Sequence, residues 1–144
     1  MISKTRFTLG STGRKDHGQA MTTAYYSHPA CLEHVNPPGH PEQVARLRAI
    51  DAALAAPGFG ALDRREAPLG TEDMLLRAHP QSYIDILREN RPDEGWVQLD
   101  PDTTMSPGSW EAAMRAVGGL TSAVEAVVAG DVQNAFVAMR PPGH

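Results

Sequence analysis

The sequence predicts an α/β protein built on a parallel sheet with helices on its faces. Segments typical of strands and of helices alternate from residue 21 onward, as in proteins whose strands are joined by helical crossovers. Clusters of glycine and proline separate these segments. The apolar run at 134–139 (NAFVAM) has no clean alternation, which is typical of a strand covered on both faces.

The first half of the pattern holds a strand, a proline-rich loop, a helix and a second strand. The stretch TAYYSH at 23–28 predicts a short strand. Residues 29–41 predict a loop, because they contain four prolines and a glycine. Apolar residues then recur at helical spacing, which predicts a helix over 42–56 that a Pro-Gly pair ends. A short strand within 62–69 follows.

The second half begins with two short helices. The first is predicted at 71–78 with Thr71 as its cap, and the second at 80–90 with Pro80 at its start. Residues 95–109 then predict a strand that runs into a polar turn.

A long helix is predicted to begin with Ser106 as N-cap and Pro107 as first helical residue, and to end at Gly130. The pair Gly118-Gly119 lowers helix stability, which indicates close packing against a neighbour. One face of this helix is marked by residues at helical spacing. They are Trp110, Met114, Val117, Thr121, Val124 and Val128.

Charge and cysteine content narrow the class of protein. The net charge of −4 argues against nucleic acid as a partner. No apolar run approaches the ~20 residues that a membrane span needs, so we expect no membrane partner. The single Cys31 favours a reducing, cytoplasmic location.

Residues 1–20 hold four basic residues and one acidic residue, a charge of +3, so residues 21–144 carry −7 and no lysine. We interpret 1–20 as a disordered leader, and the alternative is a basic targeting arm.

The tetrad Pro-Pro-Gly-His occurs twice, at 37–40 and at 141–144. The flanking residues differ, so the two copies are not an internal duplication. The second copy follows the predicted last strand directly. In parallel α/β sheets, sites form beyond the carboxyl ends of the strands, which makes His144 a candidate site residue.

Four segments in this order resemble the histone deacetylase and acetylpolyamine amidohydrolase family, in particular its bacterial class II-like branch. They are HPACLEHVNPPGHPEQVARLRAI (28–50), AHPQSYI (78–84), LDPDTTMSPGSWEAAMRAVGG (99–119) and NAFVAMRPPGH (134–144). The resemblance implies a three-layer α/β/α deacetylase-type (arginase/deacetylase) fold with a parallel sheet, incomplete at the C-terminus. Residues 21–144 are then the N-terminal portion of a deacetylase domain.

The resemblance also implies a zinc ion that activates water for attack on an acetyl-amide carbonyl. The family motif is Pro-Pro-Gly-His-His, and His144 matches its first histidine, a catalytic residue. The family's zinc ligands, an Asp-x-His pair and a later Asp, and its carbonyl-polarising tyrosine belong to sequence after this point. Zinc is therefore expected in the complete protein, and no metal ligand is assigned among these 144 residues.

Further candidates come from matching positions. The family places an acidic residue at the rim of its acyl channel, and Asp100 and Asp102 occupy that region; the alternative is a turn carboxylate or a helix cap. His34 and His40 lie in a loop that resembles the channel wall. A contact at the channel rim is expected for His34, whereas local packing at a helix start is the preferred interpretation of His40. Arg46 matches an arginine that faces an internal cavity, or is an ordinary charged residue on its helix.

The predicted function is that of the N-terminal fragment of a zinc-dependent deacetylase. Its substrates would be acetyl-lysine or acetylated polyamines, which suit the acidic, lysine-free body. One alternative is a catalytically inactive truncated remnant or binding module. Another is an arginase-type site, which would need clustered aspartates instead of tandem histidines. Oligomeric state is not predicted.

Overall fold

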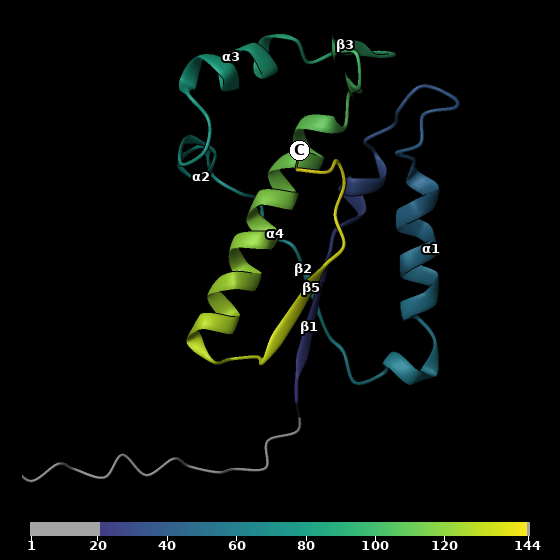
Figure 1. The fold of residues 1–144 in the computed structure, drawn as a ribbon, viewed down its shortest axis with the longest axis vertical. Coiled ribbons are helices and arrows are strands. Elements are labelled where there is room, and N and C mark those ends of the chain that lie inside the picture. Colours follow the sequence, from purple (N-terminus) through teal and green to yellow (C-terminus); the bar gives the residue numbers. More distant parts are fainter. Residues whose placement is uncertain (1–20, 144) are drawn as a thin grey trace, which may run out of the picture.

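The computed structural model describes residues 21–143. Figure 1 shows one long helix and one shorter helix on opposite sides of a few strands, with small elements gathered at one end. The predicted leader at 1–20 and the terminal His144 lie outside the described residues.

The sheet is parallel, as predicted, with the strand order β2-β1-β5. Strand β1 (Thr23–Ser27) is central, and it pairs with β2 (Asp63–Glu66) on one side and β5 (Asn134–Val137) on the other. The register is continuous, because Ala24 lies opposite residues of both neighbours. All three carboxyl ends therefore point toward one end of the molecule, where the loops converge.

Side chains of β1 alternate between two helical layers, which gives the predicted α/β/α arrangement. Ala24 and Tyr26 pack with Ala123 of helix α4 (Ser109–Ala129). Tyr25 lies on the other face and packs with Leu47 of helix α1 (Val44–Leu54). Because successive strand residues point to opposite faces, one strand supplies both cores.

Helix α4 begins two residues later than predicted. Its N-cap is Gly108 and its first residue is Ser109, because the Ser106 hydroxyl bonds to backbone groups of the loop after β1 and not to a backbone amide of the helix. The predicted end is confirmed: Gly130 has φ of +79°, the left-handed conformation that commonly terminates helices.

The predicted apolar face of α4 is wrong at its C-terminal half, where Val124 is 54% and Val128 81% exposed. The buried side of the helix consists mainly of small residues. They are Ser109, Ala112, Met114, Gly118, Gly119, Ala123 and Ala126. The backbones approach so closely that a Cβ on Gly118 would lie 2.2 Å from the Pro68 carbonyl oxygen. The predicted close packing at the glycine pair is therefore confirmed.

Helix α4 is also long and apolar enough to cross a membrane, by length and composition alone. This corrects the expectation that no stretch of the chain passes that test. One third of its most hydropathic window is buried against the protein, so packing on the sheet accounts for part of its apolar character.

The remaining elements follow the predicted order. A 3₁₀ turn, η1 (Pro29–Leu32), interrupts the predicted loop, and η2 (Pro57–Phe59) follows α1. Helices α2 (Glu72–Leu76) and α3 (Gln81–Glu89) confirm the two short helices. A hairpin of β3 (Val97–Asp100) and β4 (Thr103–Met105) replaces the predicted strand and turn.

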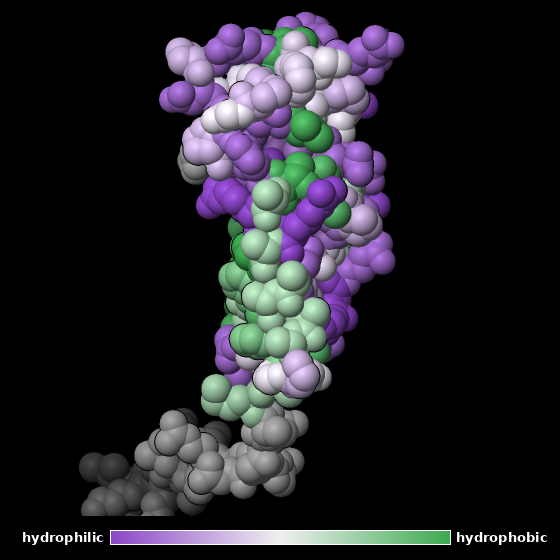
Figure 2. Space-filling model, turned by 90° about the vertical axis from the view of Figure 1, so that its right-hand side faces the viewer, coloured by the Kyte–Doolittle hydropathy of each residue, from purple (hydrophilic) through white to green (hydrophobic). Residues whose placement is uncertain are grey.

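Three details of these elements differ from expectation. Thr71 is at the N-cap of α2 but makes no side-chain capping bond, and Pro80 is the N-cap of α3 instead of its first residue. Strand β5 is not covered on both faces, because Phe136 is 46% exposed and only partly shielded by its ring stacking on Tyr25. Figure 2, which views the α1 side, shows hydrophobic surface below and hydrophilic surface around the strand-end loops.

Candidate functional site

The candidate site lies where two segments meet beyond the carboxyl ends of β1 and β5. One segment is the loop between β1 and α1, and the other is the stretch 138–143 that leaves β5. A pocket of about 160 Å³ lies beside this junction, bounded by Glu42 and the first turns of α1 (Arg46 and Leu47) on one side and by Met139 and Arg140 on the other. The two Pro-Pro-Gly stretches of the sequence flank this junction.

A buried ion pair between Glu42 and Arg140 joins the two segments. Arg140 Nε donates to Glu42 Oε1 at 2.5 Å, and Arg140 Nη2 donates to Oε2 at 2.6 Å. The side chains of Arg140 and Glu42 are only 5% and 12% exposed. Parallel hydrogen bonds of this kind fix both the distance and the orientation of the two planar groups.

The surroundings of Glu42 keep its carboxylate charged. Burial raises the pKa of Glu42, but the hydrogen bonds and positive charge of Arg140 outweigh that effect, so the pKa lies below its usual value. Asn36 Nδ2 adds a hydrogen bond to Oε2 at 2.7 Å and another to the Glu42 carbonyl at 2.8 Å. The loop is therefore fastened to the same carboxylate that holds Arg140.

His34 lies inside this network and is 4% exposed. Its Nδ1 shares a hydrogen bond of 2.7 Å with Ser109 Oγ at the start of α4, and its Nε2 lies 3.5 Å from Glu42 Oε2. Burial, reinforced by the nearby charge of Arg140, lowers the pKa of His34. The side chain of His34 is therefore buried in the described residues and does not lie at a surface rim. Its contact with a substrate stays a prediction.

Two serines tie the start of α4 to the same loop. The Ser106 amide donates to Ser109 Oγ at 2.8 Å, and Ser106 Oγ accepts from the Val35 amide at 2.9 Å. Ser106 Oγ also donates to the Glu33 carbonyl at 3.2 Å. These bonds explain why the first of the two serines does not cap the helix.

His40 and the aspartate pair occupy turn positions. His40 Nδ1 accepts from the Glu42 amide at 3.1 Å, which is the local packing role at a helix start. Asp100 and Asp102 are exposed at the tip of the β3–β4 hairpin, where Asp100 Oδ1 accepts from the Asp102 amide at 2.9 Å. This bond and one from the Thr103 side chain lower the pKa of Asp100. Their contact with substrate stays a prediction.

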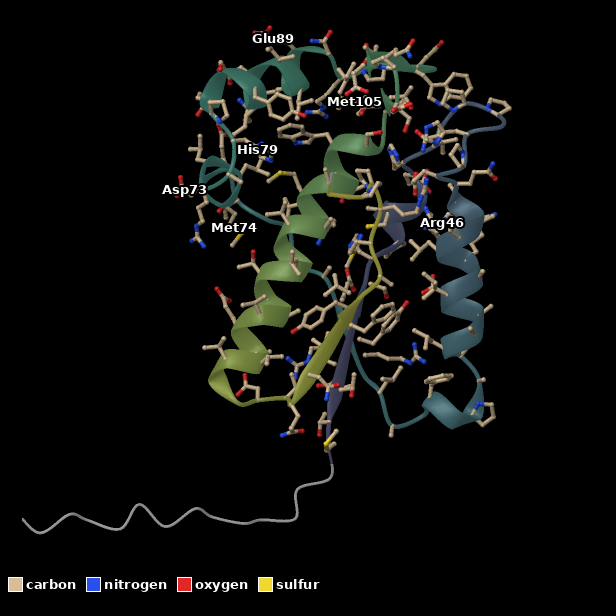
Figure 3. The ribbon with its side chains drawn as sticks, viewed as in Figure 1. Arg46, Asp73, Met74, His79, Glu89 and Met105 are labelled. Carbon is tan, nitrogen blue, oxygen red and sulfur yellow. The ribbon has the colours of Figure 1, made fainter. Side chains whose placement is uncertain are left out.

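Arg46 lies near the N-terminal end of α1 (Figure 3), and the alternative that it faces an internal cavity stays a prediction. The residue is exposed, and it also lines the pocket beside Arg140. His79 and Asp73, labelled in the same figure, lie on the far side of α4 and do not converge with it.

A zinc ion does not fit the described residues. Within residues 21–143, no group of three or more His, Cys, Asp or Glu side chains is placed to hold a metal. His34 and Glu42 are already engaged by Ser109 and Arg140, and His28 and Glu66, whose Nε2 and Oε1 lie 3.1 Å apart, are a pair without a third ligand. Zinc in proteins takes three or four such ligands, so two engaged side chains make no site.

Sequence reasoning did not identify Glu42, Arg140 or Ser109 as parts of one site. The available signal was that Glu42 follows the first Pro-Pro-Gly-His and Arg140 precedes the second. Nothing in the sequence indicates that residues so far apart meet.

Comparisons with known proteins agree with this architecture. The family described as "Histone deacetylase domain" matches residues 40–144. A histone deacetylase-like amidohydrolase of Pseudomonas aeruginosa is 34% identical over 140 residues, covering 85% of this chain and 37% of the relative. A probable deacetylase of Archaeoglobus fulgidus is 32% identical, covering 86% of this chain and 35% of the relative.

A crystal structure of the HDA15 HD domain superposes with a TM-score of 0.79 at 29% identity, covering 85% of this chain and 36% of that one. The chain thus spans about a third of the length of these relatives. The layered sheet and the family match lead to one conclusion: this chain belongs to the histone deacetylase family and has part of the α/β/α fold of the histone deacetylase domain.

Proposed function

We propose that this chain supplies the N-terminal part of a zinc-dependent deacetylase that hydrolyses acetyl-amide bonds. The observation that carries the proposal is the Glu42–Arg140 pair, which joins the first Pro-Pro-Gly-His loop to the segment leading into the second. Such a rigid junction at the carboxyl ends of parallel strands is where α/β proteins place their active sites.

The catalytic role is assigned to His144, which follows Gly143 at the end of this segment in the sequence. An imidazole there would move a proton to or from the reacting amide. Bound zinc supplies Lewis acidity to such hydrolyses. Its ligands would come from residues other than those described, because 21–143 hold no suitable group.

The substrate is proposed to be an acetylated lysine side chain or polyamine, in the cytoplasm. Residues 21–144 carry a charge of −7 without lysine, which favours basic substrates over nucleic acid. Asp100 and Asp102 at the hairpin tip are exposed carboxylates able to accept hydrogen bonds from a substrate backbone. His34 and His40 would shape the wall behind them.

The test is acetate release from an acetyl-lysine peptide and from an acetylpolyamine by the gene product that contains this chain. We expect activity that a chelator abolishes and zinc restores. His144→Ala should lower kcat by about 10²–10⁴-fold, the range for loss of general acid–base catalysis. His79→Ala, an exposed histidine beyond α4, is the matched control. A wild-type protein without activity on either substrate would refute the proposal.

A second candidate is a non-catalytic binding module formed by these 144 residues alone. It is favoured by the lack of a three-ligand group within 21–143. The purified 144-residue chain should then hold no stoichiometric zinc by elemental analysis and release no acetate. Zinc at one ion per chain would contradict this candidate.

A further inference from the structure

Most of the N–H groups of the Arg140 side chain donate hydrogen bonds to the loop that follows β1. Besides its two bonds to Glu42, its Nη1 donates to the His34 carbonyl at 2.9 Å and to the Cys31 carbonyl at 3.4 Å. Four of the five N–H groups of the guanidinium are thereby used. The residue is 4% exposed, so these bonds are shielded from water.

The Arg140 side chain forms its hydrogen bonds just beyond the point where the backbone hydrogen bonds of the sheet end. The Ala138 amide donates to the Tyr26 carbonyl at 2.9 Å, and in the described part of the chain this is the last backbone hydrogen bond between this segment and β1. Prolines at 141 and 142 have no amide hydrogen to continue such a ladder. Beyond Ala138, Met139 packs against both cores, and the polar attachment of the segment to the loop after β1 comes from the side chain of Arg140.

The residues that accept the hydrogen bonds of Arg140 are themselves held by further hydrogen bonds. Glu42 is held by Asn36, and Asn36 Oδ1 in turn accepts from Thr104 Oγ1 at 2.7 Å on β4. His34, whose carbonyl receives Arg140, is held by Ser109. The guanidinium thus meets a carboxylate and a carbonyl that are themselves positioned by two other elements.

We propose that Glu42 and Arg140 are positioning residues that fix the path of Pro141, Pro142 and Gly143. The direction of this segment sets where the chain enters residue 144. Only the catalytic role of His144 rests on the proposed function; the ordering of 141–143 by the ion pair does not.

The geometry of the pair gives the proposal a sharp test, because orientation depends on the fork of arginine. Lysine would keep the charge but present one ammonium group, which cannot form parallel bonds to a carboxylate. Arg140→Lys therefore removes the fixed orientation of the side chain relative to the Glu42 carboxylate but keeps the attraction between the two charges. Glu42→Asp is the reciprocal change, since it keeps the charge and withdraws the carboxylate by one methylene.

Both variants are made in the gene product that contains this chain. We expect Arg140→Lys to lower kcat by about 100-fold, because a displacement near 1 Å has that effect on catalysis. KM should stay within about twofold, since substrate binding itself is not altered. Hydrogen–deuterium exchange should become faster in peptides covering 31–42 and 138–143 and stay unchanged in β2.

Arg65→Lys is the matched control. Arg65 also bonds to one carboxylate through two nitrogens, at 2.8 and 2.7 Å from Asp63 Oδ2, but at the opposite edge of the sheet. It should change neither kcat nor exchange at 138–143. Arg140→Ala is compared with Arg140→Lys. Because alanine removes the charge as well as the hydrogen bonds, the kcat of Arg140→Ala should be lower than that of Arg140→Lys.

The outcomes separate the two proposals. An inactive wild-type protein refutes the deacetylase proposal, and exchange at 138–143 then decides the positioning proposal alone. Equal exchange there in wild type and Arg140→Lys overturns positioning, as does an unchanged kcat. A general increase of exchange in all peptides also overturns it, because it assigns the pair to overall stability. If Arg140→Lys does not fold, Glu42→Asp is judged by the same criteria.

Discussion

His34 and Ser109 lie 75 residues apart in the chain, and their side chains meet in the buried network at 2.7 Å. This contact joins the loop after β1 to the first turn of α4. It also places an imidazole beside the Glu42–Arg140 pair, where burial and the guanidinium both disfavour a second positive charge.

The first prediction concerns stability at mildly acidic pH. Because the pKa of His34 is lowered in the folded state, the unfolded state takes up a proton first as pH falls below about 6.5. This residue should therefore lower the free energy of unfolding by up to about 1.4 kcal/mol per pH unit in the window below 6.5.

Urea unfolding between pH 5 and 8 measures the effect. His34→Gln, which keeps a hydrogen-bonding side chain, should show a flatter dependence on pH than wild type. His79→Gln, at an exposed position, should leave the wild-type slope unchanged. A His34→Gln curve parallel to that of wild type would contradict the prediction.

The second prediction concerns the charge of Glu42. Removing one partner of a buried ion pair leaves the other uncompensated, so Glu42→Gln should lower the free energy of unfolding by about 3–5 kcal/mol at pH 7. Glu111→Gln is the control, because Glu111 is exposed and lies 3.4 Å from Arg115. Its loss should be worth about 0–1 kcal/mol.

The Glu42–Arg140 pair also makes the free energy of unfolding depend on pH, in this case through a carboxylate. The pKa of Glu42 is lowered on folding, so its contribution is complete above the unfolded value of about 4.3 and declines as pH falls through the folded value. Acid unfolding followed by circular dichroism should show a smaller loss between pH 5 and 2 in Glu42→Gln than in wild type. Identical losses would indicate that Glu42 does not contribute.

The third prediction concerns the contact between α4 and the segment that follows β2. A Cβ on Gly118 would lie 2.2 Å from the Pro68 carbonyl and 2.6 Å from the Gly70 amide nitrogen, so the helix would have to move away. Gly118→Ala should destabilise the protein by about 1–3 kcal/mol. Gly58→Ala is the control, because a Cβ there would have no atom within 4 Å and its φ is not positive. Thermal unfolding compares the two variants, and equal losses of stability would contradict the prediction.

The fourth prediction concerns the outer side of α4, which exposes Leu120 (57%), Val124 (54%) and Val128 (81%) at helical spacing. Contiguous apolar surface of this kind promotes association in water. Val124→Lys together with Val128→Lys should shift the 144-residue chain toward monomer in sedimentation velocity. Ala129→Lys, a charge added at an exposed position off this ridge, should have a smaller effect. An unchanged sedimentation coefficient in the double variant would assign any association elsewhere.

Local sequence determined the kind and order of most elements. The strand at 23–28, the helix after the proline-rich loop and the stop at Gly130 depend on periodicity, proline and glycine, which act within a few residues. The motif order likewise indicated the family that the comparisons confirm. These features were predictable because their causes lie in neighbouring residues.

Tertiary structure alone decided which face of α4 is buried and which residues form the site. The valines of α4 are more hydrophobic than its glycines, yet Gly118 faces the protein, because backbone approach at Pro68 leaves no room for a side chain. Glu42 and Arg140 are 98 residues apart, and each would be an ordinary surface charge without the other. Close contact and loss of water depend on distant neighbours, and no local pattern encodes them.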